Sequence, residues 1–134
     1  MQIRLAVPKD IEKLCQYDQH IRKQELEHSI RLNRVYMIVE GKLLLGWLRY
    51  GLFWDNTPFL NLLYLLENNR GKGIGRQAVE YWEQAMKEQG YDTVLTSTRA
   101  DEYAQHFYTK LGYKTIGGFL MEEEPFEIIL EKRL

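Results

Sequence analysis

Residues 70–76 read RGKGIGR, which places three glycines among three basic residues just before a helix-like pattern. The backbone N–H groups at the start of a helix have no intrahelical acceptor, and the helix dipole favours negative charge there. Glycines let the backbone approach a phosphate without a clash from Cβ. This segment therefore predicts a site for a phosphate or pyrophosphate. The plainer alternative is a strand-to-helix turn in which the glycines serve only the turn.

Three phosphate-binding patterns compete for this segment. A Walker loop needs Ser or Thr after its lysine, whereas Lys72 is followed by Gly73. The dinucleotide fingerprint G-x-G-x-x-A is met by Gly73, Gly75 and Ala78, but the chain is too short for two nucleotide-binding halves. The third pattern, R/Q-x-x-G-x-G/A, is met by Arg70, Gly73 and Gly75.

A second segment, residues 104–113, supports the third pattern. It reads AQHFYTKLGY, an A-x-x-F-Y helix that ends in a Gly-aromatic pair, here Ala104, Phe107, Tyr108, Gly112 and Tyr113. With both segments in this order, the sequence resembles the GNAT superfamily of acetyl-coenzyme A-dependent N-acetyltransferases. The resemblance covers nearly the whole chain and implies a GNAT-like fold with acetyl-CoA as cosubstrate.

The resemblance also implies where acetyl-CoA binds. In such enzymes the fourth and fifth strands splay apart, and the pantetheine arm bonds the exposed backbone of the fourth strand. Leu65 and Leu66 would supply those backbone contacts here. The pyrophosphate would lie on the backbone N–H groups of Arg70, Gly71, Lys72, Gly73, Ile74, Gly75 and Arg76.

Tyr108 matches the position of the family's usual general acid. In such enzymes a substrate amine attacks the thioester directly, and the tetrahedral intermediate then expels the coenzyme A thiolate. A phenol with an unperturbed pKa near 10 stays protonated at neutral pH and can donate to that sulfur. The resemblance therefore implies a catalytic Tyr108, whereas the helical pattern alone favours a core residue.

The residue that acts as general base is less clearly marked. Many relatives place a glutamate on the fourth strand for this role, but the strand expected at residues 59–66 contains no carboxylate. Glu25, Glu27 and His28 on an early helix are candidates, and proton loss through ordered water is the default. Many relatives have an asparagine where this chain has Asp101, and we interpret Asp101 first as a helix cap and second as a cofactor contact.

The elements that position these residues follow from hydrophobic periodicity. The order is β-α-α-β-β-β-α-β-α-β-β, an α/β domain with a mixed sheet of about seven strands flanked by about four helices. Strands are expected at residues 2–7, 34–40, 42–54, 59–66, 91–97, 113–120 and 125–134. Helices are expected at residues 8–21, 23–32, 74–89 and 101–112.

Length and composition predict a single domain over residues 1–134. A net charge of −1 argues against nucleic-acid binding, and no apolar run reaches membrane-span length. The lone Cys15 suits a reducing cytoplasm and is expected to pack in the core. His20, His28 and His106 show no metal-ligand spacing, so no metal is expected. Dimerisation, which is common in the family, stays open.

The function that the resemblance to the GNAT superfamily implies is transfer of an acetyl group from acetyl-CoA to a primary amine, on a small molecule or a peptide. Trp54 and Asp55 either flank the acceptor cleft or, as we slightly prefer, are a core tryptophan and a turn aspartate. Residues 122–124, an acidic run, are expected to form a solvated hairpin tip. Two alternatives stay open: a non-catalytic acyl-CoA-binding sensor domain, and a dinucleotide-binding protein.

Overall fold

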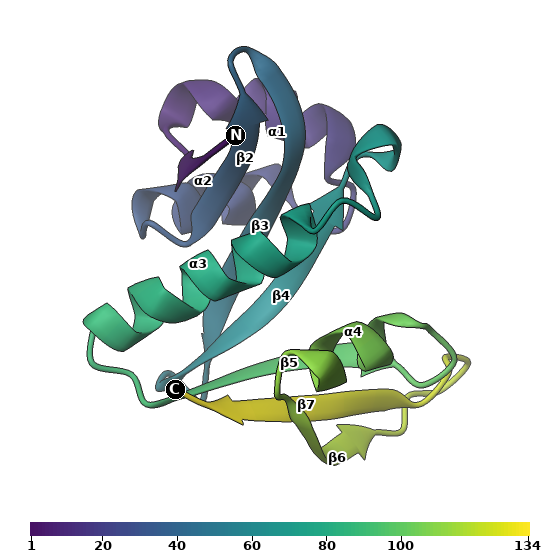
Figure 1. The fold of residues 1–134 in the computed structure, drawn as a ribbon. Coiled ribbons are helices and arrows are strands. Elements are labelled where there is room, and N and C mark those ends of the chain that lie inside the picture. The colour runs from purple at the N-terminus through teal and green to yellow at the C-terminus, as the bar shows by residue number, and fades with distance from the viewer. The chain divides into compact units, whose positions relative to one another are not determined.

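The computed structural model describes residues 1–134 and contains the predicted order of strands and helices. Two short 3-10 helices, η1 (Pro8–Asp10) and η2 (Glu67–Asn69), are added to it. The elements are β1 (Gln2–Leu5), α1 (Ile11–Tyr17), α2 (Lys23–Arg31), β2 (Val35–Glu40), β3 (Leu43–Phe53), β4 (Thr57–Leu65), α3 (Ile74–Glu88), β5 (Thr93–Arg99), α4 (Ala104–Lys110), β6 (Lys114–Phe119) and β7 (Glu127–Arg133) (Figure 1).

The strands form one seven-stranded mixed sheet in the order β1-β2-β3-β4-β5-β7-β6. β4 pairs with β5 in parallel, while β1 with β2, β2 with β3, β5 with β7 and β6 with β7 are antiparallel. The fold class expected from the sequence is therefore confirmed. No helix is long and apolar enough to cross a membrane.

Within this fold the residues group into two compact units. The first consists of Met1–Gly51 and Leu62–Ala78, and the second of Leu52–Asn61 and Val79–Leu134. The chain passes from one unit to the other inside β3, β4 and α3. A single domain over residues 1–134 stays a prediction.

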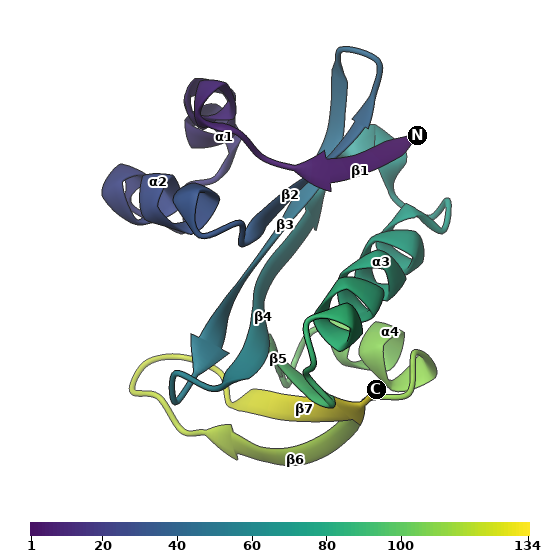
Figure 2. The same ribbon diagram turned by 90° about the vertical axis from the view of Figure 1, so that its left-hand side faces the viewer.

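In the first unit, α1 and α2 pack on the sheet strands β1 to β3 through a continuous apolar core (Figure 2). β2 supplies alternate side chains to this core, as expected for a strand packed on one face by helices. Cys15 packs against it as predicted. The core consists of Ala6, Leu14, Leu26, Ile30, Val35, Met37, Val39, Leu44 and Trp47.

The first predicted helix ends earlier than residue 21, because a buried carboxylate turns the chain at Asp18. Asp18 accepts hydrogen bonds from Arg49 Nε at 2.8 Å, Trp47 Nε1 at 3.0 Å and the His20 N–H at 3.1 Å. Burial alone would raise the pKa of this carboxyl, but the Arg49 and Trp47 hydrogen bonds outweigh burial and lower it. The turn after α1 is thus fixed to β3 by an ion pair that the helical periodicity could not reveal.

In the second unit, β7 lies between β5 and β6, and alternation along these strands separates two faces. One face is buried and carries Val94, Thr96 and Leu130. It faces α3 and α4, because Lys132 on that side of β7 donates to Glu83 on α3 at 2.9 Å. The opposite face, which includes Ile129, is only half-buried. A register shift between Thr115 and Gly117 marks a bulge or irregularity in β6.

Gly46 on β3 allows β4 to approach closely, because a Cβ there would meet the Tyr64 carbonyl oxygen and lie 2.7 Å from Leu65 Cδ2. We expect Gly46→Ala to lower the free energy of unfolding by about 1–3 kcal/mol, since it overpacks a filled site. Urea denaturation measures this change. Gly117→Ala, at a strand glycine with open space around it, is the control. Equal stability of the two variants would contradict the prediction.

Candidate active site

The glycine-rich segment lies in the first unit, between η2 and α3, and has the backbone expected of an anion-binding turn. Gly71 and Gly73 have φ angles of +74° and +79°, which favour glycine, and no atom lies within 4 Å of a Cβ built at either. The first helical bond joins the Gln77 N–H to Gly73 O at 3.1 Å, so the N–H groups of Ile74 and Gly75 precede the helical ladder. The residues present therefore fit a pyrophosphate.

The basic side chains of this turn are exposed, as an anion site requires. Lys72 and Arg76 are both on the surface. Arg70 is also exposed, but its Nε donates to Leu65 O at 3.0 Å and its guanidinium lies 5.2 Å from the centre of the Tyr64 ring. The turn thus places three cations beside open glycines, and one of them is held by β4.

The two predicted backbone contacts to the cofactor, Leu65 at the end of β4 and Leu66 directly after it, differ in their hydrogen bonds within the chain. Leu65 O accepts a hydrogen bond from the exposed Arg70 side chain, which an incoming ligand can displace. Leu66 donates its N–H to Leu45 O at 2.9 Å and accepts from the Asn69 N–H at 2.8 Å. Both backbone groups of Leu66 are therefore already paired within the chain, and only its carbonyl oxygen, which can accept a second hydrogen bond, is left to meet a cofactor donor.

Tyr108 lies in the second unit on α4 and is 6% exposed. It packs edge-on against Tyr113, with ring centroids 5.4 Å apart. Burial raises the pKa of Tyr108 to about 12, and a hydrogen bond with Thr96 acts in the opposite direction. Thr96 is paired with Leu60 in the parallel ladder, and its Oγ1 donates to Leu60 O at 3.0 Å. Tyr108 is thus a protonated phenol placed beside the β4–β5 pairing.

A buried ion pair that the sequence analysis missed supports Tyr113. The Tyr113 hydroxyl donates to Glu83 Oε2 at 2.7 Å, and Lys132 Nζ donates to Glu83 Oε1 at 2.9 Å. Burial and the Glu83 carboxylate raise the pKa of Tyr113 above its usual range. A signal was available, because Glu83 is a charged residue on the buried side of α3, four residues after Val79.

The other predicted residues lie as follows. Glu25 and His28 are exposed on α2, and Glu27 is half-buried. The prediction that Asp101 caps a helix is wrong: α4 begins after Tyr103 without a side-chain cap, and Asp101 instead accepts from Arg99 Nη2 at 3.0 Å. Because Arg99 binds the Asp101 carboxylate, that carboxylate is not available to cap the helix.

The tip of the β3–β4 hairpin also differs from expectation. Trp54 is 83% exposed, so the interpretation as a core tryptophan is wrong. Trp54 and Asp55 have φ angles of +54° and +61°, which turn the chain sharply and direct the indole away from the core. The acidic run at residues 122–124 is exposed in a turn, as predicted.

The raised pKa of Tyr108 predicts a loss of stability in alkali. Below pH 10 both folded and unfolded chains bind the phenol proton, whereas between pH 10 and about 12 only the folded chain retains it. Stability therefore falls as pH rises through this window, by up to about 2.7 kcal/mol from this group. Urea unfolding at pH 9 and pH 11.5 should show a smaller loss for Tyr108→Phe than for the wild type. Tyr103→Phe, at an exposed position, should behave as wild type.

Comparison with known families decides the assignment. The sequence profile of the Acetyltransferase (GNAT) family matches residues 5–113. The chain belongs to this family. A comparison with curated proteins found no match. The cosubstrate of GNAT acetyltransferases is acetyl-CoA, as the sequence motifs led us to expect.

Solved structures of GNAT proteins share the fold at low identity. Ard1 from Thermoplasma volcanium has a TM-score of 0.84 and 17% identity, covering 99% of this chain and 97% of its own. PaiA N-acetyltransferase from Thermoplasma acidophilum, in complex with coenzyme A, has a TM-score of 0.81 and 20% identity, with coverages of 99% and 98%. An aminoglycoside 6'-N-acetyltransferase complexed with coenzyme A has a TM-score of 0.82 and 18% identity, covering 99% of this chain and 97% of its own. At these identities the likeness shows the fold.

Proposed function

We propose that this GNAT protein transfers the acetyl group of acetyl-CoA to a primary amine, by direct attack of the amine on the thioester. The observation that carries the proposal is Tyr108, a buried phenol whose pKa of about 12 keeps its proton available at neutral pH. The printed names of structural relatives, including PaiA N-acetyltransferase and aminoglycoside 6'-N-acetyltransferase, support nitrogen as the acceptor atom.

The cofactor is expected to lie on the first unit. The N–H groups at the start of α3 and the side chains of Lys72 and Arg76 would hold its pyrophosphate. Leu65 would bond the pantetheine arm once Arg70 releases its carbonyl oxygen. Arg70 would then be available to the phosphates. Its side chain would bond Leu65 O in the free protein and the phosphates in the cofactor complex.

In the proposed reaction, proton transfers accompany the formation of the C–N bond and the cleavage of the C–S bond. The substrate ammonium loses a proton to water, or to Glu25, Glu27 or His28 on α2. The free amine attacks the thioester carbonyl and forms the new C–N bond. The tetrahedral intermediate collapses, the C–S bond breaks, and Tyr108 gives its proton to the departing sulfur. The proton that the acetylated nitrogen loses returns to solvent or to the tyrosinate.

Water is favoured as the base, because Glu25 and His28 are exposed and have no partner that orients them. This also keeps one alternative under test, a sensor domain that binds acyl-CoA without transferring the acyl group. The absence of a carboxylate on β4 (Thr57–Leu65) favours that alternative.

On the ground of its single cysteine, we further propose that the protein works in the cytoplasm.

The test combines binding and turnover on the same preparation. Calorimetry with acetyl-CoA, and with NAD as a control, establishes the cofactor. Thiol release is then followed with a panel of aliphatic, aromatic and peptide amines, and mass spectrometry locates the acetyl group on the nitrogen. Acetyl-CoA binding with amine-dependent thiol release supports the proposal. Tight binding with no turnover on any amine would replace it by the sensor.

A further inference from the structure

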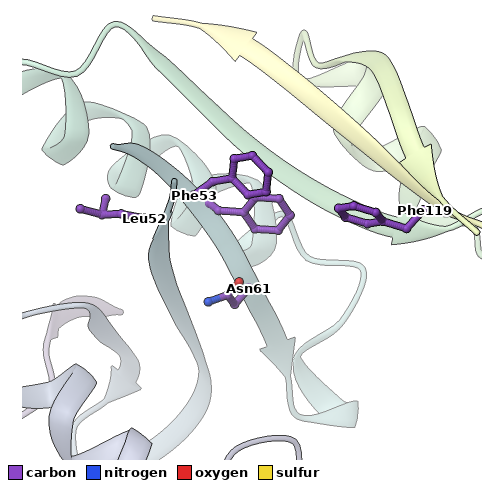
Figure 3. Close-up of a pocket in the computed structure, with 5 residues that line it drawn as sticks. Leu52, Phe53, Asn61 and Phe119 are labelled. Carbon is purple, nitrogen blue, oxygen red and sulfur yellow. The ribbon is translucent and has the colours of Figure 1, made fainter. Parts of the chain in front are cut away.

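A groove lined by aromatic rings opens on the half-buried face of the second unit. It consists of two adjoining cavities, of about 240 Å³ and about 360 Å³, which share Phe53, Phe59 and Phe119. Figure 3 shows Phe53 from β3, Asn61 from β4 and Phe119 from β6 around the smaller cavity. We call these two cavities the aromatic groove. No residue of the proposed catalytic or cofactor-binding set lines it.

The lining of the aromatic groove is mostly apolar and open to solvent. Phe119 is 45% exposed and Ile116 is 54% exposed, although both are large hydrophobic side chains. The larger cavity adds Trp54, Leu95 and Ile129 to the lining. Exposed apolar surface gathered in a concave site is the usual property of a ligand pocket.

Only one charged side chain, Glu131, lines the groove. Glu131 is directly paired with Leu95 on β5, so both side chains lie on the same face as the groove. Glu131 forms no ion pair within the chain, and Lys114, its cross-strand partner on β6, does not line the cavity. A ligand here therefore meets one negative charge, and no cationic side chain lines the groove to offset it.

The Asn61 end of the groove lies beside the strand pair that Tyr108 approaches. Asn61 follows Leu60, which pairs with Thr96 in the β4–β5 ladder. Thr96 hydrogen-bonds with Tyr108 on the covered face of the sheet, whereas the groove is on the other face. An amine at the Asn61 end would thus lie against the same strand pair as the proposed acid, on its opposite face.

We infer that the aromatic groove binds the body of the acceptor, and that the acceptor is an arylalkyl primary amine whose remote end is uncharged or cationic. The inference rests on the proposed function, because it names the acceptor class for that reaction. The amine lies toward Asn61, the aromatic body packs among Phe53, Phe59 and Phe119, and Glu131 repels a remote carboxylate.

The experiment measures binding by calorimetry, without turnover, for three amines. 2-Phenylethylamine should bind roughly 10- to 100-fold more tightly than ethylamine, since burying a phenyl group is favourable by that factor. 4-(2-Aminoethyl)benzoic acid, which carries a remote carboxylate, should bind roughly tenfold more weakly than 2-phenylethylamine. Equal affinities of ethylamine and 2-phenylethylamine would overturn the inference.

Two pairs of variants assign the effects to the groove. Phe119→Ala should remove most of the preference for the phenyl group, whereas Phe126→Ala, at a similarly exposed phenylalanine outside the groove, should retain it. Glu131→Gln should restore binding of the remote carboxylate, whereas Glu127→Gln on the same strand should not. Full preference in Phe119→Ala, or no restoration in Glu131→Gln, would overturn the inference.

Failure of this inference is distinguishable from failure of the proposed function. Acetylation of polyamines or lysine peptides with no preference for arylalkylamines would keep the function and overturn the groove assignment. Groove-dependent binding of 2-phenylethylamine with no acetyl transfer would do the reverse. If Phe119→Ala instead turned a dimer into a monomer in sedimentation and left amine binding unchanged, the groove would be an interface between two copies.

Discussion

Gly73→Glu is expected to weaken acetyl-CoA binding by at least about 100-fold, which corresponds to about 2.7 kcal/mol. Gly73 immediately precedes α3, has a φ angle of +79° and leaves open space where a Cβ would stand. Glutamate at this position would put a carboxylate into the space that the pyrophosphate needs. The substitution therefore combines steric exclusion with repulsion of like charges at a helix N-terminus. Calorimetry with acetyl-CoA measures the effect.

Gly90→Glu is the matched control for backbone strain. Gly90 follows the other end of α3, has a φ angle of +95° and likewise has no atom near a built Cβ. Both variants introduce the same side chain at a left-handed residue, and each should lose about 1 kcal/mol of stability. Only Gly73→Glu should lose the cofactor. Equal acetyl-CoA affinity in the two variants would mean that the turn does not hold the pyrophosphate.

Tyr108→Phe is expected to lower kcat by about 100- to 1000-fold while leaving acetyl-CoA affinity unchanged. The substitution removes only the hydroxyl, so the packing of the ring against Phe107 and Tyr113 is retained. Without the phenol proton, the coenzyme A thiolate must leave as an anion or take a proton from water. Steady-state kinetics with saturating amine, together with calorimetry, separates the chemical step from binding.

The control for this variant is Tyr103→Phe, which removes a hydroxyl from an exposed tyrosine just before α4. It should retain wild-type kcat. If Tyr108→Phe also retained its turnover, Tyr108 would be a packing residue and the proton would come from elsewhere. A parallel loss of acetyl-CoA binding would instead indicate that the hydroxyl holds the cofactor.

Local sequence patterns predicted the elements well where the pattern is strong. The apolar stripe of α3 and the left-handed glycine that follows it, Gly90, placed that helix to within a residue or two, because both signals are local. The boundaries of α1 and α4 were poorer. At α1 the turn depends on Arg49, a residue of β3, and at α4 the Asp101 carboxylate is taken by Arg99.

Two features depended on contacts between distant residues and were not predicted. Glu83 is a charged residue on the buried side of α3, but the sequence does not reveal its partners Tyr113 and Lys132, through which it supports Tyr108. The aromatic groove was also missed, because its members come from the five strands β3 to β7 and lie together only through strand pairing. A hydrophobic period relates residues along one helix or strand, so it cannot link residues that stand on different elements.

The sequence by itself determined the family and the cosubstrate, because both depend on short segments whose residue types carry the chemistry, and its periodicity determined the order of the elements; the anion-binding turn stays a prediction. The tertiary structure decided which carbonyl Arg70 occupies, how Tyr108 is held protonated, and which face of the second unit is left open. These properties arise from desolvation and from the approach of distant side chains, which only the folded chain brings about.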